Sequence, residues 1–117
     1  MGRILIADDE ENIREVLLRA LEAKGHRVDA VPDGDAAALA LAEREYDLVV
    51  TDLKMPGRSG MELLQAIKEA THDTAVILIT AFGSIENAVE AIKLGADDYI
   101  VKPFRLDEVE LKIARVF

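Results

Sequence analysis

The chain has 117 residues, the length of a single domain, and no run of Gly, Pro or Ser divides it. Its 23 Asp and Glu outnumber its 14 Lys and Arg, and the net charge of −9 disfavours contact with nucleic acid. The chain has no Cys, which excludes disulfides, thiolate zinc sites and cysteine nucleophiles. No apolar run reaches the ~18 residues of a membrane span and no signal peptide precedes the first acidic residues, so we expect a cytoplasmic protein without a membrane partner.

Five apolar runs have the length of β-strands, and a segment of helix length follows each of them. The runs are Arg3–Ala7, Arg27–Val31, Leu48–Thr51, Ala75–Thr80 and Tyr99–Val101. Runs such as RILIA and AVILIT are apolar almost without interruption, which is typical of parallel strands that are covered on both faces. The alternation therefore predicts an α/β fold, a three-layer sandwich with right-handed crossovers around a five-stranded parallel sheet.

The first two helices differ in their patterns. Apolar residues three and four positions apart, from Ile13 to Leu21, predict an amphipathic first helix. Arg14 and Arg19 fall on its polar side, and Gly25 is a stop signal. The second helix is the Ala-rich segment AAALALAERE, whose small side chains permit close approach to the sheet.

Capping and stop signals delimit the last three helices. Ser59 and Glu62 fit a capping box at the start of the third helix. Ser84 is the expected cap of the fourth helix, which Gly95 ends. The fifth helix follows Pro103, and its apolar spacing continues to the last residue, so we expect residues 1–117 to form one domain with no output domain.

Polar residues stand at four of the five strand ends, where ligands bind in open parallel sheets. Asp8 and Asp9 follow the first strand, Asp52 the third and Lys102 the fifth, and Thr80 ends the fourth. The carboxylates of the first and third strands can meet only if these strands are neighbours. This requirement favours the strand order 2-1-3-4-5, which is that of flavodoxin-like folds.

Three carboxylates in one crevice repel one another and favour a hard divalent cation such as Mg²⁺, which takes oxygen ligands. An acidic pair at a helix start can also serve only as a cap, and loop water can solvate Asp52. Lys102 would balance part of the negative charge and could hold an oxygen of an incoming phosphoryl group, to which the Thr80 hydroxyl could also donate. Four strand ends with acids, a hydroxyl and a base favour a functional site over coincidence.

The segments ADDE, TDLKMPGRSG, TAFGS and YIVKPF carry these residues, and their order and spacing resemble the receiver domain of two-component response regulators over essentially the whole chain. The resemblance implies a flavodoxin-like (βα)5 fold. It also implies that Asp52 accepts a phosphoryl group from the phosphohistidine of a histidine kinase, with Mg²⁺ as cofactor. Such a domain catalyses only its own phosphorylation and dephosphorylation, and it is not otherwise an enzyme.

The resemblance also assigns metal ligands. Asp9 and Asp52 would ligate Mg²⁺ directly, and Asp8 would do so directly or through water. The backbone carbonyl of Lys54 would complete the ligands from the protein. A cis Lys102–Pro103 peptide bond is further implied, which would aim the lysine ammonium into the crevice.

Other residues would transmit or time the signal. By the same resemblance Thr80 and Tyr99 form a switch pair, which alters the face made by the fourth helix, fifth strand and fifth helix. We call this the signalling face. Lys54 and Phe82 would flank the path of the hydrolytic water, and their bulk predicts slow loss of the phosphoryl group. The implied partners are a histidine kinase and, through the signalling face, the chain's own output domain or a second copy, without direct contact to nucleic acid.

Within the family, TDLKMPGRSGMELL and TAFGSIENAVEAIKLGADDYIVKPF are most similar to receivers of nitrogen-regulation-type transcriptional activators. Such activators continue into an ATPase and a DNA-binding domain, so the chain is either an excised fragment or a stand-alone receiver in a phosphorelay. Alternatives are a haloacid-dehalogenase-type phosphatase with an aspartyl phosphate, a flavin-binding flavodoxin, and a receiver that is no longer phosphorylated. The lack of a DxD motif at Asp8 and Asp9 opposes the phosphatase, and the acidic loop after the first strand opposes the flavodoxin. The presence of Asp52 opposes a receiver that is no longer phosphorylated.

Overall fold

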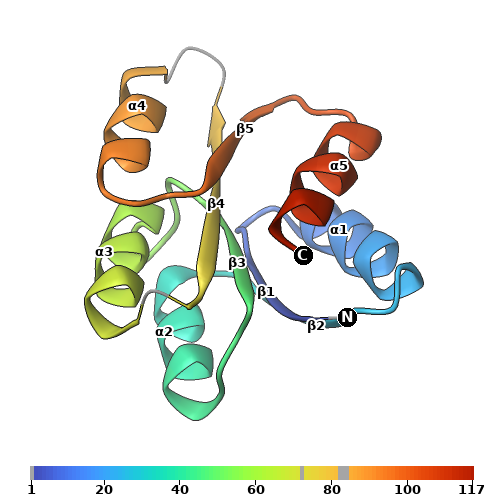
Figure 1. The fold of residues 1–117 in the computed structure, drawn as a ribbon, viewed down its shortest axis with the longest axis horizontal. Coiled ribbons are helices and arrows are strands. Elements are labelled where there is room, and N and C mark those ends of the chain that lie inside the picture. The colour runs from blue at the N-terminus through green and yellow to red at the C-terminus, as the bar shows by residue number, and fades with distance from the viewer. Residues whose placement is uncertain (1, 72, 82–84) are drawn as a thin grey trace.

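The structure, a computed structural model, describes residues 2–71, 73–81 and 85–117 (Figure 1). Strands and helices alternate along these residues, as the sequence predicts. The strands are β1 (Arg3–Ala7), β2 (Arg27–Val31), β3 (Leu48–Asp52), β4 (Ala75–Ala81) and β5 (Asp98–Lys102). The helices are α1 (Glu11–Ala23), α2 (Gly34–Glu43), α3 (Gly60–Ala70), α4 (Ile85–Lys93) and α5 (Leu106–Val116). Within the described residues, no helix has the length and apolar character needed to cross a membrane.

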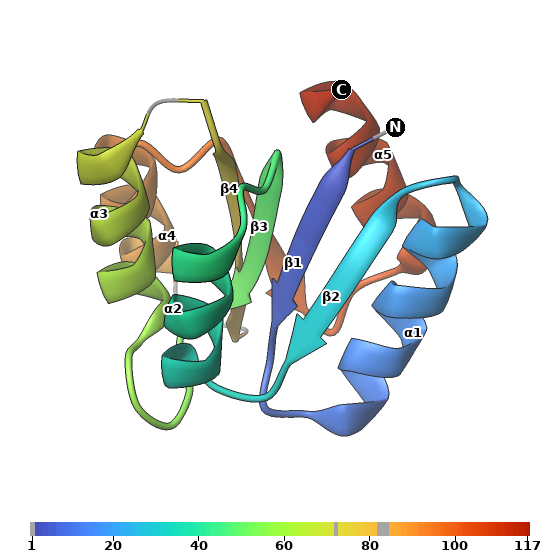
Figure 2. The same cartoon turned by 90° about the horizontal axis from the view of Figure 1, so that it is seen from below.

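The strands form one parallel sheet in the order β2-β1-β3-β4-β5. Helices α1 and α5 cover one face of the sheet, and α2, α3 and α4 cover the other (Figure 1, Figure 2). The predicted three-layer sandwich and its flavodoxin-like strand order are therefore confirmed. The central position of β1, β3 and β4 leaves β2 and β5 as the edge strands.

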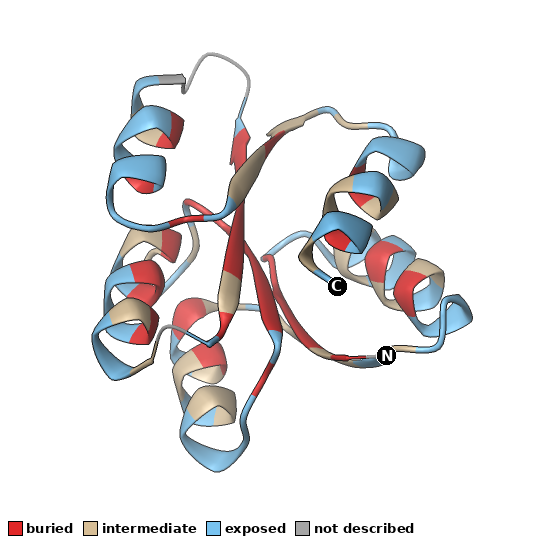
Figure 3. Cartoon of the chain, viewed as in Figure 1, coloured by how far each residue is buried: buried red, intermediate tan, exposed pale blue. Residues whose placement is uncertain are grey.

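Alternate residues of each strand point to opposite faces of the sheet and build two apolar cores. In β1, Ile4 and Ile6 belong to the core beneath α1 and α5, whereas Leu5 and Ala7 belong to the core beneath α2, α3 and α4. Buried positions gather in the central strands and on the sides of the helices that face them (Figure 3). Packing on both faces explains the uninterrupted apolar runs and holds the strand ends in place.

The local signals at element boundaries agree with the structure. The Ser59 side chain accepts a hydrogen bond from the Glu62 N–H, and the Glu62 side chain accepts one from the Ser59 N–H. The capping box is thereby confirmed. The Lys102–Pro103 peptide bond is cis, as the resemblance implies. Ser84, the expected cap of α4, lies outside the described residues.

Three strands are longer than the sequence predicts. β3 continues to Asp52, β4 continues to Ala81, and β5 begins at Asp98 and continues to Lys102. The reason is that these residues still pair with neighbouring strands, since Asp52 lies opposite Ile79 and Ala81 lies opposite Lys102 in the sheet. Two of the predicted site residues therefore belong to strands rather than to loops.

The start of α2 packs directly against the loop between β3 and α3. The Gly34 N–H donates to the Pro56 carbonyl at 3.2 Å, and a Cβ atom at Gly34 would collide with the carbonyl oxygen of Arg58. Asp33 caps the helix at this point with its side chain. Glycine at position 34 therefore lets two backbone segments touch, and α2 braces the loop that follows β3.

We expect Gly34→Ala to lower the free energy of unfolding by about 1–3 kcal/mol, because the added methyl group has no space beside the Arg58 backbone. Leu39→Ala is the matched control in the same helix. Leu39 is 67% exposed, so its truncation should change the free energy of unfolding by no more than about 0.5 kcal/mol. Urea unfolding measures both variants, and equal effects would show that the brace contributes nothing.

Candidate functional site

Two adjacent strands bring the predicted carboxylates together. Asp8 follows the last residue of β1 and Asp52 ends β3, and Ala7 is paired with Thr51 between these strands. Asp8 is 0% and Asp52 8% exposed, whereas Asp9 faces solvent. Each of the three acids can place an oxygen within 4.8 Å of the others. We call this group of three carboxylates at the carboxyl edge of the sheet the acid cluster.

The Lys102 ammonium faces the acid cluster. Lys102 ends β5, and its side chain reaches past β4. Its Nζ lies 2.9 Å from Asp52 Oδ2 and 3.2 Å from Asp8 Oδ2. The exposed carboxylate of Glu10 also lies 3.4 Å from Nζ. One ammonium thus contacts the carboxylates of Asp52, Asp8 and Glu10, and the crevice keeps a net negative charge.

The titration of these groups follows from burial and from the neighbouring charges. Burial raises the pKa of Asp8 and the Asp52 charge raises it further, against the opposing effects of the Glu10 N–H and of Lys102. Burial alone would lower the pKa of Lys102, but the Asp52 and Asp8 carboxylates outweigh it, and the pKa lies above its ordinary value. Lys102 therefore stays protonated, whereas ionisation of the Asp8 carboxyl group costs stability.

Asp8 has one oxygen that suits a cation. Its Oδ1 accepts a hydrogen bond from the Glu10 N–H at 2.8 Å. Its buried Oδ2 has no aligned hydrogen-bond donor among the described residues, and the nearby group is the Lys102 ammonium. A buried carboxylate oxygen with free capacity, beside two other carboxylates, matches the preference of Mg²⁺ for oxygen ligands. The residues present therefore fit a divalent cation.

Asp52 is held from both sides. Its Oδ1 accepts a hydrogen bond from the Lys54 N–H at 3.2 Å, and its Oδ2 faces Lys102. The next residue, Leu53, donates its N–H to the Ile79 carbonyl at 2.9 Å and so ties the start of the loop to β4. Lys54 thus contacts Asp52 through its backbone N–H, and the residue is exposed.

Thr80 and Tyr99 lie on the neighbouring strands β4 and β5. Thr80 is 1% exposed, and its hydroxyl donates to the Ile100 carbonyl at 3.5 Å. Tyr99 is half-buried, and the Nζ of Lys112 lies 2.7 Å from its carbonyl oxygen and 5.3 Å from its ring centroid. The Thr80 hydroxyl thus points toward β5. Phe82, which the resemblance places beside the water path, lies outside the described residues.

Two charged residues contact the site although the sequence did not assign them to it. Glu10 pairs with Lys102, and Arg14 Nη1 donates to the backbone carbonyl of Asp8 at 2.8 Å. Helical periodicity placed Arg14 on the polar side of α1, but its half-buried side chain turns back to the strand end. Glu10 and Arg14 are four residues apart, a spacing that is typical of an ion pair on a helix. The spacing does not predict that Glu10 contacts Lys102 and that Arg14 contacts the Asp8 carbonyl instead.

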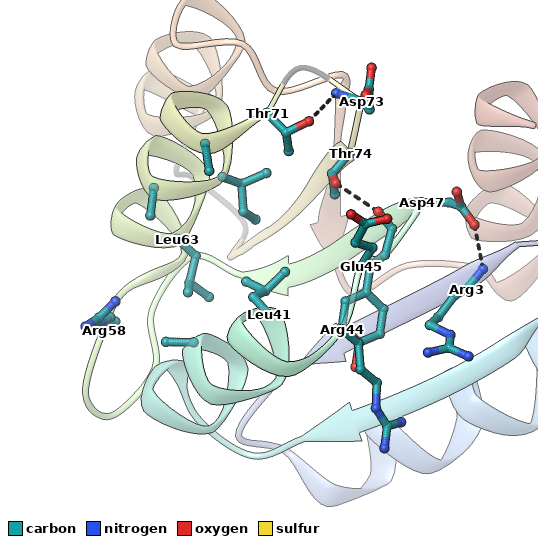
Figure 4. A pocket seen from close by; sticks show the side chains of 15 residues that line it. Arg3, Leu41, Arg44, Glu45, Asp47, Arg58, Leu63, Thr71, Asp73 and Thr74 are labelled. Atoms are coloured by element: carbon teal, nitrogen blue, oxygen red, sulfur yellow. Dashed lines mark hydrogen bonds between the residues drawn. The ribbon is translucent and has the colours of Figure 1, made fainter.

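A separate hollow of about 530 Å³ lies between α2 and α3, at the amino end of the sheet (Figure 4). Apolar side chains such as Leu41 and Leu63 line it, together with polar residues such as Arg3 and Asp47. Asp47 precedes β3 and Asp52 ends it, so the hollow and the acid cluster lie at opposite ends of that strand. None of the predicted site residues that the structure describes lines the hollow.

Known proteins are similar to this chain in sequence and in fold. Residues 4–114 match the family described as response regulator receiver domain. The two-component response regulator PhoP of Pseudomonas aeruginosa is 38% identical over 111 residues, which are 95% of this chain and 49% of PhoP. The regulatory protein AtoC of Escherichia coli is 39% identical over 115 residues, which are 98% of this chain and 25% of AtoC. The chain spans a quarter to a half of the length of such relatives.

Solved structures superpose closely on this one. NtrX from Brucella abortus, in complex with ADP, has a TM-score of 0.92 at 37% identity, over 98% of this chain and 26% of that one. TrrA from Thermotoga maritima, in complex with Mg²⁺ and BeF, has a TM-score of 0.88 at 37% identity, over 100% of both chains. The chain therefore belongs to the response regulator receiver domain family, and it is not a classical enzyme. This membership sets aside the phosphatase and the flavodoxin.

We expect Asp8→Asn to raise the melting temperature by several degrees at pH 7 in the presence of a chelator, because it removes a buried charge beside Asp52. The folded protein binds the Asp8 proton more tightly than the unfolded chain does. The contribution of Asp8 to the stability of the wild type is therefore complete at pH values below the pKa that Asp8 has in the unfolded chain. It is lost as the pH rises through the higher pKa that Asp8 has in the folded protein. The advantage of the variant should be largest at neutral pH and should vanish in acid.

Thermal unfolding between acid and neutral pH measures this difference. Asp73→Asn is the control, because Asp73 is exposed and the same substitution there removes no buried charge. A melting temperature of Asp8→Asn below that of the wild type at pH 7 would show that the ion pair with Lys102 outweighs the burial.

Proposed function

We propose that Asp52 accepts a phosphoryl group from the phosphohistidine of a histidine kinase. The observation that carries this proposal is that Asp52 lies beside the other two acids and that its Oδ2 lies 2.9 Å from the Lys102 Nζ. A carboxylate in this place has a cation beside it that can balance the charge of a transferred group. Membership in the receiver family, and the two-component relatives such as PhoP, support a histidine kinase as the donor.

Asp8, Asp9 and Asp52 would hold Mg²⁺, and the backbone carbonyl of Lys54 would complete the protein ligands. When bound, Mg²⁺ neutralises the acid cluster and the charge on the transferred phosphoryl oxygens. The acid cluster and the buried Oδ2 of Asp8, which has no aligned hydrogen-bond donor among the described residues, support this assignment. TrrA supports it further, since its structure contains Mg²⁺ and BeF.

Asp52, Lys102 and Thr80 would then have separate roles in the transfer of the phosphoryl group. An Asp52 oxygen forms a bond to phosphorus while the bond from phosphorus to the histidine nitrogen breaks, and the imidazole keeps the bonding pair. Lys102, which its raised pKa keeps protonated, balances charge on a phosphoryl oxygen. Thr80 would turn its hydroxyl from the Ile100 carbonyl to another phosphoryl oxygen.

Movement of Thr80 and Tyr99 would couple the site to the signalling face on α4, β5 and α5. Tyr99 lies on β5, the strand that Lys102 ends, so the acid cluster and this face share one strand. The face would bind the chain's own output domain or a second copy, and the domain itself would contact no nucleic acid. Lys54 and Phe82 would flank the path of the hydrolytic water. The proposed place of action is the cytoplasm.

We further infer that the chain is the receiver of a transcriptional activator of the nitrogen-regulation type. Support comes from the segments around Asp52 and Lys102 and from similarity to AtoC and NtrX. The identity to PhoP is equally high, so identity alone does not separate the types. Sequencing the gene beyond codon 117 tests this inference. An ATPase domain downstream would support it, whereas a stop codon or another kind of output domain would contradict it.

Incubation with acetyl phosphate and Mg²⁺ should add one phosphoryl group to the wild type. Asp52→Asn should abolish this addition, because an amide lacks the anionic oxygen that attacks phosphorus. Asp47→Asn makes the same change at the other end of β3, outside the acid cluster, and should be phosphorylated like the wild type. Intact-mass spectrometry compares the three proteins, and an adduct on Asp52→Asn would place the acceptor elsewhere.

A further inference from the structure

Arg14 lies in α1, yet its side chain returns to the end of β1. Its Nη1 donates to the backbone carbonyl of Asp8 at 2.8 Å, and the residue is half-buried. On a helix surface the usual partner of an arginine is an acid four residues earlier, which here is Glu10. The Glu10 carboxylate instead lies 3.4 Å from Lys102. Arg14 therefore donates its hydrogen bond to the backbone of Asp8, a residue of the acid cluster.

This hydrogen bond satisfies a carbonyl that regular structure does not. Asp8 comes after the last residue of β1 and before the first residue of α1, so its carbonyl lies outside both the strand and the helix. Asp8 is 0% exposed, and a backbone carbonyl in such a place needs a donor from elsewhere. A charged guanidinium is a strong donor for this purpose.

Both the side chain and the backbone carbonyl of Asp8 accept hydrogen bonds from the turn between β1 and α1 and from α1 itself. Glu10, the residue before α1, makes no capping hydrogen bond with its side chain. The Asp8 side chain accepts the Glu10 N–H, and the Asp8 carbonyl accepts Arg14. These two hydrogen bonds join the start of the helix to the strand end, and the exposed Asp9 lies between Asp8 and Glu10 in the chain.

We propose that Arg14 is a positioning residue of the metal site, which fixes Asp8 and Asp9 at the strand end and thereby sets the affinity for a divalent cation. The inference rests on the proposed binding of Mg²⁺ by the acid cluster. Groups that orient metal ligands without touching the metal commonly change metal affinity about 10–100-fold when they are removed.

Charge and position predict opposite results for the loss of Arg14. Removal of a positive charge near three carboxylates should strengthen the binding of a cation. Release of the turn that carries two of those carboxylates should weaken it. The sign of the change therefore separates a positioning role from a purely electrostatic one.

The experiment is a titration of the folded protein with Mg²⁺ alone, followed by isothermal calorimetry. We expect Arg14→Met to weaken Mg²⁺ binding about tenfold. Arg19→Met is the matched control, since Arg19 is an exposed arginine on the same helix and its loss removes the same charge. Its Mg²⁺ affinity should equal or slightly exceed that of the wild type.

Amide hydrogen exchange at Glu10 gives a second readout, because the turn should open more often in Arg14→Met than in Arg19→Met. Should Arg14→Met fail to fold, Arg14→Lys keeps the charge, and weaker Mg²⁺ binding by that variant would support the proposal. Unchanged or tighter binding by a folded Arg14 variant would overturn the positioning role alone. Absence of Mg²⁺ binding by the wild type would instead overturn the proposed metal site.

Discussion

Crowding of negative charge at the carboxyl edge of the sheet is the constraint on which the rest of this structure depends. Asp8 and Asp52 can meet only if β1 and β3 are neighbours, and the sheet has this pairing, with β2 at one edge and β5 at the other. Both carboxylates are buried, and the Lys102 ammonium lies within 3.2 Å of each. Buried charges of this kind oppose folding unless the surrounding structure holds them. The two apolar cores hold the strands, so the whole sheet positions the acid cluster.

The unbalanced charge would also allow the site to respond to a ligand. Burial and the Asp52 charge raise the pKa of Asp8, which means that ionisation of Asp8 weakens the folded state, and a bound cation would offset this cost. A phosphoryl group on Asp52 would change the competition for the Lys102 ammonium among Asp8, Glu10 and Asp52. Lys102 and Tyr99 share β5, so such a change would act on a strand of the proposed signalling face.

Strand periodicity and the chemistry of strand ends are local signals, and they were enough to predict the sheet order and the proximity of Asp8 to Asp52. Strands β3 and β5 are longer than predicted, because Asp52 and Lys102 continue the pairing although polar residues at a strand end resemble loop residues. Side-chain direction could not be predicted. Helical spacing assigns Arg14 to one side of α1, but only the packed structure shows that it turns to Asp8 and that Glu10 turns to Lys102.

A crystal structure with Mg²⁺ and beryllofluoride, an analogue of a phosphoryl group, tests most directly whether Asp52 is the phosphoacceptor of the acid cluster. We expect beryllium bonded to an Asp52 oxygen, the cation ligated by Asp9 and Asp52, and the Lys102 ammonium in contact with a fluoride. Beryllofluoride bound at another residue would contradict this expectation. So would an unmodified Asp52 that still lies 2.9 Å from Lys102 Nζ at saturating concentrations of both ligands.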